Sequence, residues 1–132
     1  MTNKKVFKSI NGLELVVLYK KSAVIFEIGN NEIDNRFDFR FNSKTFKELF
    51  YYLKDFANKA WDNIQLRECD SLGSDYVGYY DKELDNDGYL QLDLNELFIE
   101  RVCIGNNRLY KFNKRKMESF LYDFDKLIKK SY

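Results

Sequence analysis

The sequence has no histidine and no proline among its 132 residues, and only two cysteines. Histidine is the side chain that most often serves as a general base or a metal ligand near neutral pH. Its absence excludes serine and cysteine triads that depend on histidine, and it excludes histidine-bound zinc. Without proline, the turns of this chain depend on glycine, asparagine and aspartate.

Other absences narrow the class of protein further. Cys69 and Cys103 are too few for a disulfide framework, and we expect two reduced thiols. The sequence lacks a run of about 18 apolar residues, so it predicts no membrane span and no membrane partner. At the N-terminus, Val6 and Phe7 are followed at once by Lys8, and no signal peptide is readable. We therefore expect a cytoplasmic protein.

The apolar content is sufficient for one core. The chain is 45% hydrophobic and 17% aromatic, while 33% of its residues are charged. A chain of this length buries roughly two-thirds of its surface on folding, whereas a unit of about 60 residues is marginal alone. No linker or low-complexity tract separates the two halves, so we predict a single domain over residues 1–132.

One pattern occurs twice within that domain. Residues 28–31 read Ile-Gly-Asn-Asn, and residues 104–107 read the same. Each copy leads to a Phe-Asn pair and then to an amphipathic helix, and from Phe41 onward the copies match at a constant offset of 71. The sequence thus divides into two pseudo-repeat units, residues 1–61 and 62–132.

Hydrophobic periodicity predicts the same order of elements in both units. Alternation with period two predicts strands, and apolar spacings of three and four residues predict helices. Asn42 or Ser43 can cap the first helix, which is expected to end near Trp61. The predicted fold is α+β, with two tandem antiparallel sheet-then-helix units that share one core. The predicted strands are 6–10, 13–19, 23–28, 33–41, 76–80, 89–94, 98–104 and 108–112, and the predicted helices are 45–59 and 114–129.

The net charge of +1 hides an uneven distribution. Residues 62–100 hold 2 basic and 11 acidic side chains, whereas residues 1–61 carry a net charge of +4 and residues 101–132 one of +6. An acidic segment between two basic segments produces a dipolar molecule. The field of such a molecule steers a basic partner.

Tyrosines lie among the acids of this central segment. Tyrosine is frequent at the energetic centres of protein interfaces, and acidic charges contribute to partner choice. The same acids would repel phosphates, which argues against a base-stacking role for these tyrosines. We predict a protein-binding patch on a protein with no catalytic residue, no cofactor and no metal. Its predicted members are Asp75, Tyr76, Tyr79, Tyr80, Asp81, Glu83, Asp85, Asp87 and Tyr89.

The acidic turn in this segment also has the spacing of the start of a calcium loop. Glu83, Asp85, Asp87 and Gly88 would occupy its positions 1, 3, 5 and 6. Position 12, where the bidentate glutamate belongs, is Leu94 instead. The segment that follows alternates like a strand, so a solvated hairpin turn is the expected structure.

Several segments together resemble the WapI-type immunity proteins that bacteria carry beside polymorphic toxins. The resemblance covers about the full length. It implies a stoichiometric inhibitor that binds one toxin domain, often a nuclease, and occludes its active site. The segments are the hairpin around Asn11-Gly12, the strand 36–41 rich in Phe, Arg and Asp, the helix 45–59, Trp61 with its polar connector, the segment 87–92 and the closing strand and helix 109–128.

The duplicated order of sheet and helix is also similar to the PUR and whirly families of single-stranded nucleic-acid binders. This second resemblance implies binding by a sheet face that carries aromatic and basic residues. In the first unit, Phe37, Phe39, Arg36 and Arg40 would serve. Nucleic acid is a predicted partner only under this alternative. The sequence leaves open the oligomeric state and whether the strands form separate sheets or a continuous one.

Overall fold

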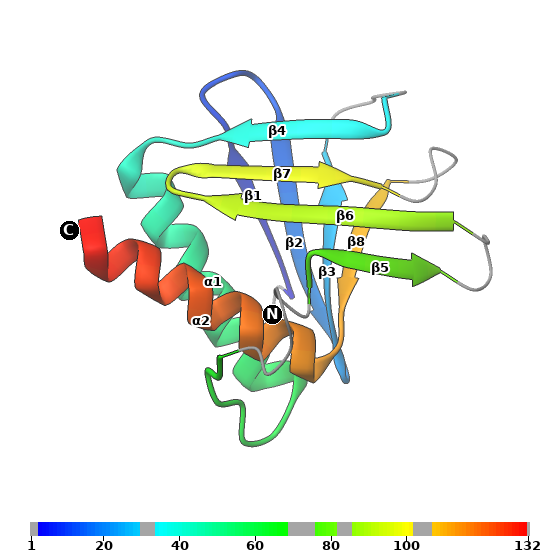
Figure 1. The fold of residues 1–132 in the computed structure, drawn as a ribbon, viewed down its shortest axis with the longest axis vertical. Helices are drawn as coiled ribbons and strands as arrows, with labels where there is room; N and C mark the ends of the chain where they lie inside the picture. Colours follow the sequence, from blue (N-terminus) through cyan, green and yellow to red (C-terminus); the bar gives the residue numbers. More distant parts are fainter. Residues whose placement is uncertain (1–2, 30–33, 69–75, 82–85, 102–106, 132) are drawn as a thin grey trace.

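The computed structural model describes residues 3–29, 34–68, 76–81, 86–101 and 107–131. Within these residues the chain forms two four-stranded sheets and two helices (Figure 1). Sheet A has the order β1-β2-β3-β8 and sheet B has the order β4-β7-β6-β5, with antiparallel pairing throughout. The strands of sheet A are β1 (Lys4–Lys8), β2 (Glu14–Lys20), β3 (Ala23–Ile28) and β8 (Arg108–Phe112). The strands of sheet B are β4 (Arg36–Arg40), β5 (Gly78–Asp81), β6 (Asn86–Asp93) and β7 (Glu96–Glu100).

The predicted α+β class is confirmed, and the two sheets exchange one strand between the sequence units. Strand β8 of the second unit pairs with β3 of the first, and β4 of the first unit pairs with β7 of the second. Each sheet therefore contains three strands from one unit and the last strand of the other. The two sheets are separate in their pairing, and their strands run in different directions (Figure 1).

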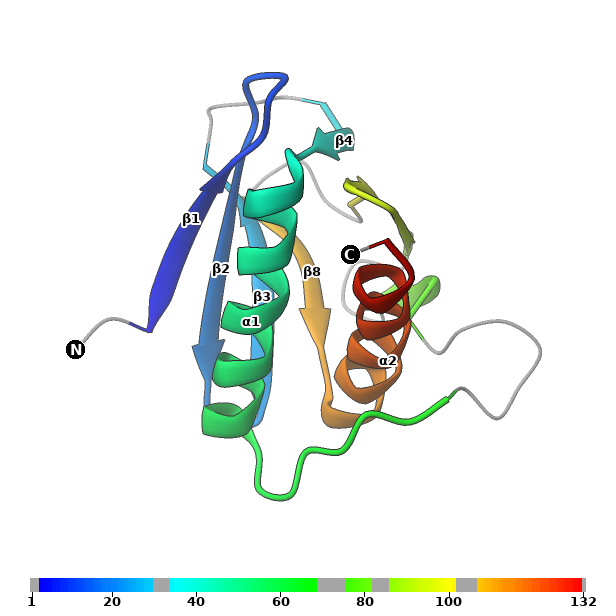
Figure 2. The same ribbon diagram turned by 90° about the vertical axis from the view of Figure 1, so that its left-hand side faces the viewer.

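The helices are α1 (Ser43–Ala60) and α2 (Lys114–Ser131), whose bounds are again offset by 71 residues. Asn42 caps α1, because its side-chain oxygen accepts a hydrogen bond from the Thr45 N–H at 2.8 Å. The Asn113 side chain accepts one from the Lys116 N–H at the same distance. The helices lie side by side and antiparallel (Figures 1 and 2), and neither combines the length and apolar character of a membrane span.

One hydrophobic cluster contains residues of both sheets and both helices. Helix α1 packs on β1, β2 and β3, while α2 lies against β6 and β8. Aromatic rings join the units: the centroids of Phe46 and Phe124 are 4.5 Å apart, and those of Phe26 and Phe112 are 5.0 Å apart. The periodic apolar positions of the two units thus meet in a shared core.

Some strand boundaries differ from the predicted ones. Strand β1 ends at Lys8, because Ser9 already bonds to Leu13 to close the loop of the first hairpin. Strand β6 begins at Asn86, so Asp87 and Gly88 of the predicted acidic hairpin turn belong to a strand. Leu94 lies in the two-residue loop before β7 and is 41% exposed rather than packed with the sheet.

Candidate functional site

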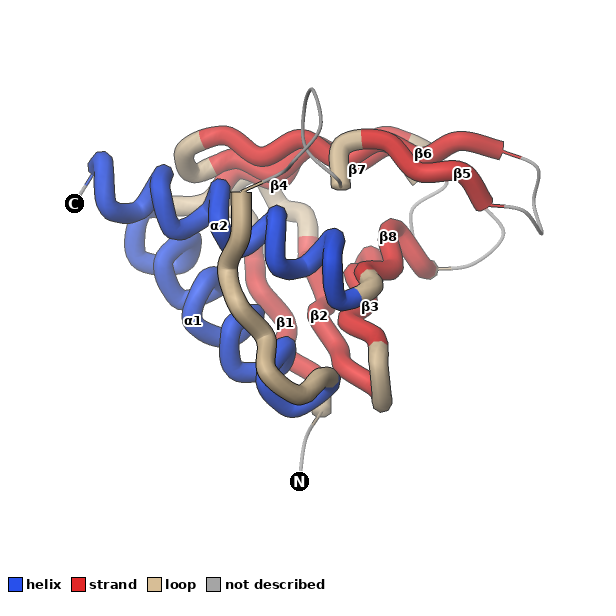
Figure 3. Tube along the Cα trace, turned by 60° about the horizontal axis from the view of Figure 1, so that its bottom comes forward, coloured by secondary structure: helices blue, strands red, loops and turns tan. Residues whose placement is uncertain are grey.

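The candidate site is the outer face of sheet B, called face B from here on. It is the side of the sheet turned away from both helices (Figures 1 and 3). Alternate residues of these strands, such as Phe39, Leu97 and Leu90, are completely buried on the opposite side. The register therefore brings the intervening side chains together on the open side. Face B consists of Arg36, Asp38 and Arg40 from β4, Glu96, Phe98 and Glu100 from β7, and Tyr89, Gln91 and Asp93 from β6.

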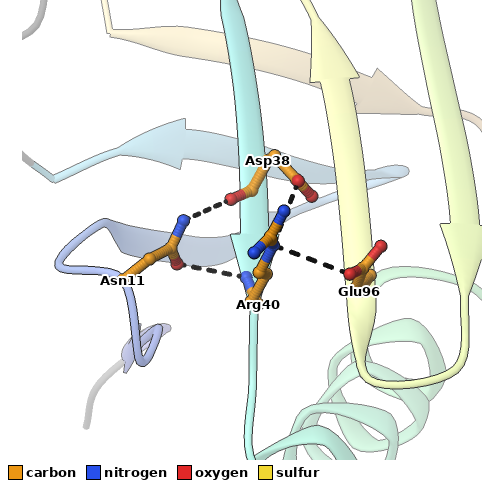
Figure 4. A network of polar contacts seen from close by, with 4 residues as sticks. All are labelled: Asn11, Asp38, Arg40 and Glu96. Carbon is orange, nitrogen blue, oxygen red and sulfur yellow. Dashed lines mark hydrogen bonds and ion pairs between the residues drawn. The ribbon is translucent and has the colours of Figure 1, made fainter.

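Ion pairs cross face B from β4 to β7. The Arg36 Nε lies 2.6 Å from a carboxylate oxygen of Glu100. The Arg40 Nε lies 3.3 Å from Asp38 and 3.6 Å from Glu96, so one guanidinium serves two carboxylates (Figure 4). The described part of face B holds four carboxylates and two arginines, and its charge is therefore acidic.

Asp93 and Glu96 form a like-charge pair on this face. They are directly opposite each other at the end of the β6–β7 hairpin. Like charges directly opposite one another on a sheet destabilise it. The Arg40 guanidinium, which contacts Glu96, also contacts Asp38, so its positive charge is divided. The pair therefore leaves unbalanced negative charge on the open side of the sheet.

A shallow hollow of about 190 Å³ lies among these acids. The Phe98 ring forms part of its lining, and the Tyr89 ring meets the Phe98 ring edge-on with centroids 5.9 Å apart. Tyr89 is 37% exposed. An aromatic pair beside carboxylates can receive a cationic side chain through both charge and cation–π contact. The hollow is lined by Asp38, Gln91, Asp93, Glu96 and Phe98.

The tip of the first hairpin holds β4 in place (Figure 4). The Asn11 side chain donates to the Asp38 carbonyl at 2.8 Å and accepts from the Arg40 N–H at 3.3 Å. The Ile10 N–H donates to the Arg40 carbonyl at 2.7 Å. Gly12 provides the positive φ of 89° that the turn requires. Sheet A thereby fixes the edge strand that carries Asp38 and Arg40.

The predicted binding residues fall into three groups. Asp75, Glu83 and Asp85 lie outside the described residues. The structure places Tyr79, Tyr80 and Asp81 in β5 and Asp87 in β6, and it does not describe their side chains. The two whose side chains are described are Tyr76 and Tyr89, and only Tyr89 lies on face B.

Tyr76 is in the core. It is 4% exposed, and its hydroxyl donates to a carboxylate oxygen of Asp123 at 2.5 Å. Its ring meets the Phe120 ring edge-on, and its carbonyl accepts a hydrogen bond from the Tyr110 hydroxyl at 2.7 Å. Tyr76 therefore joins α2 to β8 and offers almost no surface to a partner.

Sequence reasoning did not select most of face B. It missed Asp38, Gln91, Asp93, Glu96 and Phe98, which the sheet register assembles. A signal was present in the sequence, because Leu90 and Leu92 alternate with Tyr89, Gln91 and Asp93. Residues 89, 91 and 93 therefore point to the opposite side of the strand from these two leucines.

The residues suggested for nucleic-acid binding divide between the two sides of sheet B. Phe37 and Phe39 are 3% and 0% exposed, so they pack in the core and cannot stack on bases. Arg36 and Arg40 are exposed but paired with carboxylates. The basic and aromatic residues of β4 therefore do not form one binding surface.

The predicted hairpin turn and the calcium-loop spacing lie partly outside the described residues. Asp87 and Gly88 belong to strand β6, which continues to Asp93, so no helix follows the acidic turn. Among the residues that the structure describes, no three potential ligands gather in a group that could hold a metal ion.

Comparison of the chain with protein-family models, with curated proteins and with solved structures finds no match in any of the three. The function of this chain is therefore inferred from the geometry and charge of face B.

Proposed function

We propose that this protein is a non-enzymatic immunity protein that binds a cognate toxin domain and neutralises it by occluding its active site. The observation that carries the proposal is the open, acidic face B with an aromatic pair in it. Interfaces commonly combine an aromatic centre with charged groups that select the partner. Face B offers both on one sheet.

The like-charge pair supports a role in binding. Asp93 opposite Glu96 lowers the stability of the free protein, because each carboxylate repels the other. A basic side chain of a partner that entered the hollow would interact favourably with both. Residues that cost stability in the free state are frequent at functional sites, where the bound state compensates.

The charge of face B favours a partner with a basic active site. A nuclease has such a site, since it must bind the phosphates of its substrate. Opposite charges would accelerate the encounter of the two proteins and align the acidic sheet with the groove. A sheet seated across the groove would exclude the substrate without any chemistry of its own. The proposal places this protein in the bacterial cytoplasm, beside the toxin that it restrains.

The test is a binding measurement with the toxin domain encoded beside the gene of this chain. Replacing both Asp93→Lys and Glu96→Lys should weaken the complex by about 100-fold, which is within the range for close interfacial charges. The double replacement also removes the ion pair between Arg40 and Glu96, so the folding and stability of the variant are measured by circular dichroism and urea denaturation before the affinities are compared. The matched control on sheet A is Lys20→Glu with Lys111→Glu, which should alter the dissociation constant by less than about twofold.

The possible outcomes distinguish the proposed immunity role from the proposed binding surface, face B. Failure of the unmodified protein to bind or to protect cells from the toxin contradicts the immunity role. If the protein protects cells but the face B variant and the sheet A variant bind the toxin with equal affinity, then the toxin does not bind through face B, and only the immunity role stands. A salt-sensitive gel shift of single-stranded DNA would support the nucleic-acid alternative instead, and no shift at low salt would remove that alternative.

A further inference from the structure

Strand β1 forms an edge of sheet A. The bonds at both ends of the strand show which of its residues pair with β2: the Tyr19 N–H donates to the Asn3 carbonyl, and the Ser9 N–H donates to the Leu13 carbonyl. In an antiparallel pair, the residues that bond to the neighbour alternate with residues that point away from it. The N–H and carbonyl groups of Lys4, Val6 and Lys8 therefore point to the open edge, where no described residue pairs with them.

This edge differs from the edge of sheet B at β4. There the hairpin tip bonds to the backbone of Asp38 and Arg40 through the Asn11 side chain and the Ile10 N–H. An exposed strand edge can pair with another chain, and proteins commonly cover such edges. Within the described residues, the chain covers β4 and leaves β1 uncovered (Figure 2).

The side chains beside the β1 edge offer further contacts. Val6 is 44% exposed on the outer side of the strand. On the inner side, the Lys5 ammonium lies 5.1 Å from the centre of the Tyr52 ring, and Phe7 meets the same ring edge-on. Tyr52 and its neighbour Tyr51, which is 56% exposed, line a hollow of about 240 Å³ with Asp55. A strand added at this edge would place alternate side chains next to Val6 and next to Tyr52.

The charges at the edge discriminate between possible occupants. A second copy paired antiparallel about Val6 would place Lys4 opposite Lys8 twice, and like charges directly opposite are unfavourable. A strand that carries carboxylates would instead oppose each lysine with an acid. The complementary occupant is therefore an acidic extended segment and not another copy of this chain.

We propose that the β1 edge binds an extended acidic segment of a partner protein as a fifth strand of sheet A, with an apolar or aromatic side chain resting against Tyr51 and Tyr52. Main-chain hydrogen bonds supply affinity in such strand addition, and alternate side chains supply specificity. The surface belongs to sheet A, so the inference does not depend on the function proposed for face B.

The test uses two synthetic eight-residue peptides, one alternating glutamate and valine with a central tyrosine, the other with lysine in place of glutamate. Titration followed by amide NMR should shift the amide signals of Lys4, Val6 and Lys8. The acidic peptide should bind at least about tenfold more tightly than the basic one.

Val6→Pro is the decisive variant. Its missing N–H is one that points away from β2, so all pairing within sheet A is retained while one bond to the added strand is lost. The variant should bind the acidic peptide at least about tenfold more weakly. Lys4→Glu with Lys8→Glu provides a second variant that keeps the backbone intact, and it should reverse the preference between the two peptides.

Three results would overturn the proposal. One is the absence of shifts in β1 at about 1 mM acidic peptide. Another is equal affinity of the acidic peptide for the folded Val6→Pro protein and for the unmodified one. The third is a dimer of the free protein that protects the β1 amides, which would identify a second copy as the occupant.

Discussion

In both sheets alternate residues of each strand point to the outer face. The two outer faces differ in which charges lie opposite each other on neighbouring strands. On sheet A, Lys8 lies opposite Glu14 with 3.9 Å between the charged atoms, and Glu27 lies opposite Arg108. On face B, Asp93 lies opposite Glu96. Sheet A thus places unlike charges opposite each other at both positions, whereas face B keeps, beside its ion pairs between β4 and β7, a pair of acids that disfavours the free state.

The apolar side chains of the two faces also differ, in how much of their surface is exposed. Val16 and Ile25 lie on the outer side of sheet A, outside the core cluster, yet each is only 6% exposed. On face B, Tyr89 is 37% exposed beside Phe98. Sheet A thus shields apolar groups at its centre, and face B presents an aromatic ring.

The first and largest predicted effect tests whether these two faces belong to one cooperative unit. The Phe120 ring lies 5.1 Å from that of Phe112 in sheet A and 5.0 Å from that of Tyr76, which precedes sheet B. Phe120→Ala should lower the free energy of unfolding by about 3–5 kcal/mol because it leaves a cavity. Denaturation followed by circular dichroism and by amide NMR should show one transition for both sheets.

The control for this variant is Tyr51→Ala, which removes an exposed ring and should change stability by no more than about 0.5 kcal/mol. Two separate transitions, with only one of them shifted by Phe120→Ala, would contradict a single domain.

The second prediction concerns the contact that joins the sheets. Asn11→Ala removes two hydrogen bonds to the backbone of β4, so it should cost about 1–2 kcal/mol of stability. Hydrogen exchange at the Arg40 amide should accelerate more than exchange within β2. Ile10→Ser, at a side chain that is 69% exposed, is the control and should leave both quantities nearly unchanged. Equal exchange at Arg40 in the two variants would show that the hairpin does not hold this edge.

The smallest predicted effect tests the charge difference directly. Asp93→Lys converts a like-charge pair into an opposite-charge pair and should raise stability by about 0.2–1 kcal/mol. Lys8→Glu makes the reverse change opposite Glu14 and should lower stability by a similar amount. Urea denaturation measures both, and high salt should shrink both effects. A loss of stability in Asp93→Lys would contradict the view that this acid is unfavourable in the free protein.

Local patterns predicted the helices well, because the caps and apolar spacing lie within a few residues of each other. The bounds of β3 and β8 were also predicted as the structure has them. Sequence did not reveal that β4 and β8 exchange sheets, since pairing between distant strands depends on the tertiary fold. A Phe-Asn pair marks the end of each strand: Phe41-Asn42 follows β4, and Phe112-Asn113 begins with the last residue of β8. Nothing in the sequence of either strand distinguishes the two possible partners.

The candidate site was located only in part. The charge count identified the acidic segment that contains Tyr89, Asp93 and Glu96. It grouped residues that are neighbours in the sequence, whereas face B groups residues that are neighbours in the sheet. Asp38 and Arg40 belong to a segment of net positive charge, and they reach face B only because β4 pairs with β7. Tyr76 carries the same sequence signal as the other tyrosines, yet the position of α2 places it in the core.

The central claim is that face B contacts the toxin. Hydrogen exchange of the complex with the toxin domain encoded beside this gene, compared with the free protein, tests it most directly. We expect added protection in β6 and β7 around Gln91 and Phe98, with exchange in β1 and β2 unchanged. Protection confined to sheet A, with none in β6 or β7, would contradict it.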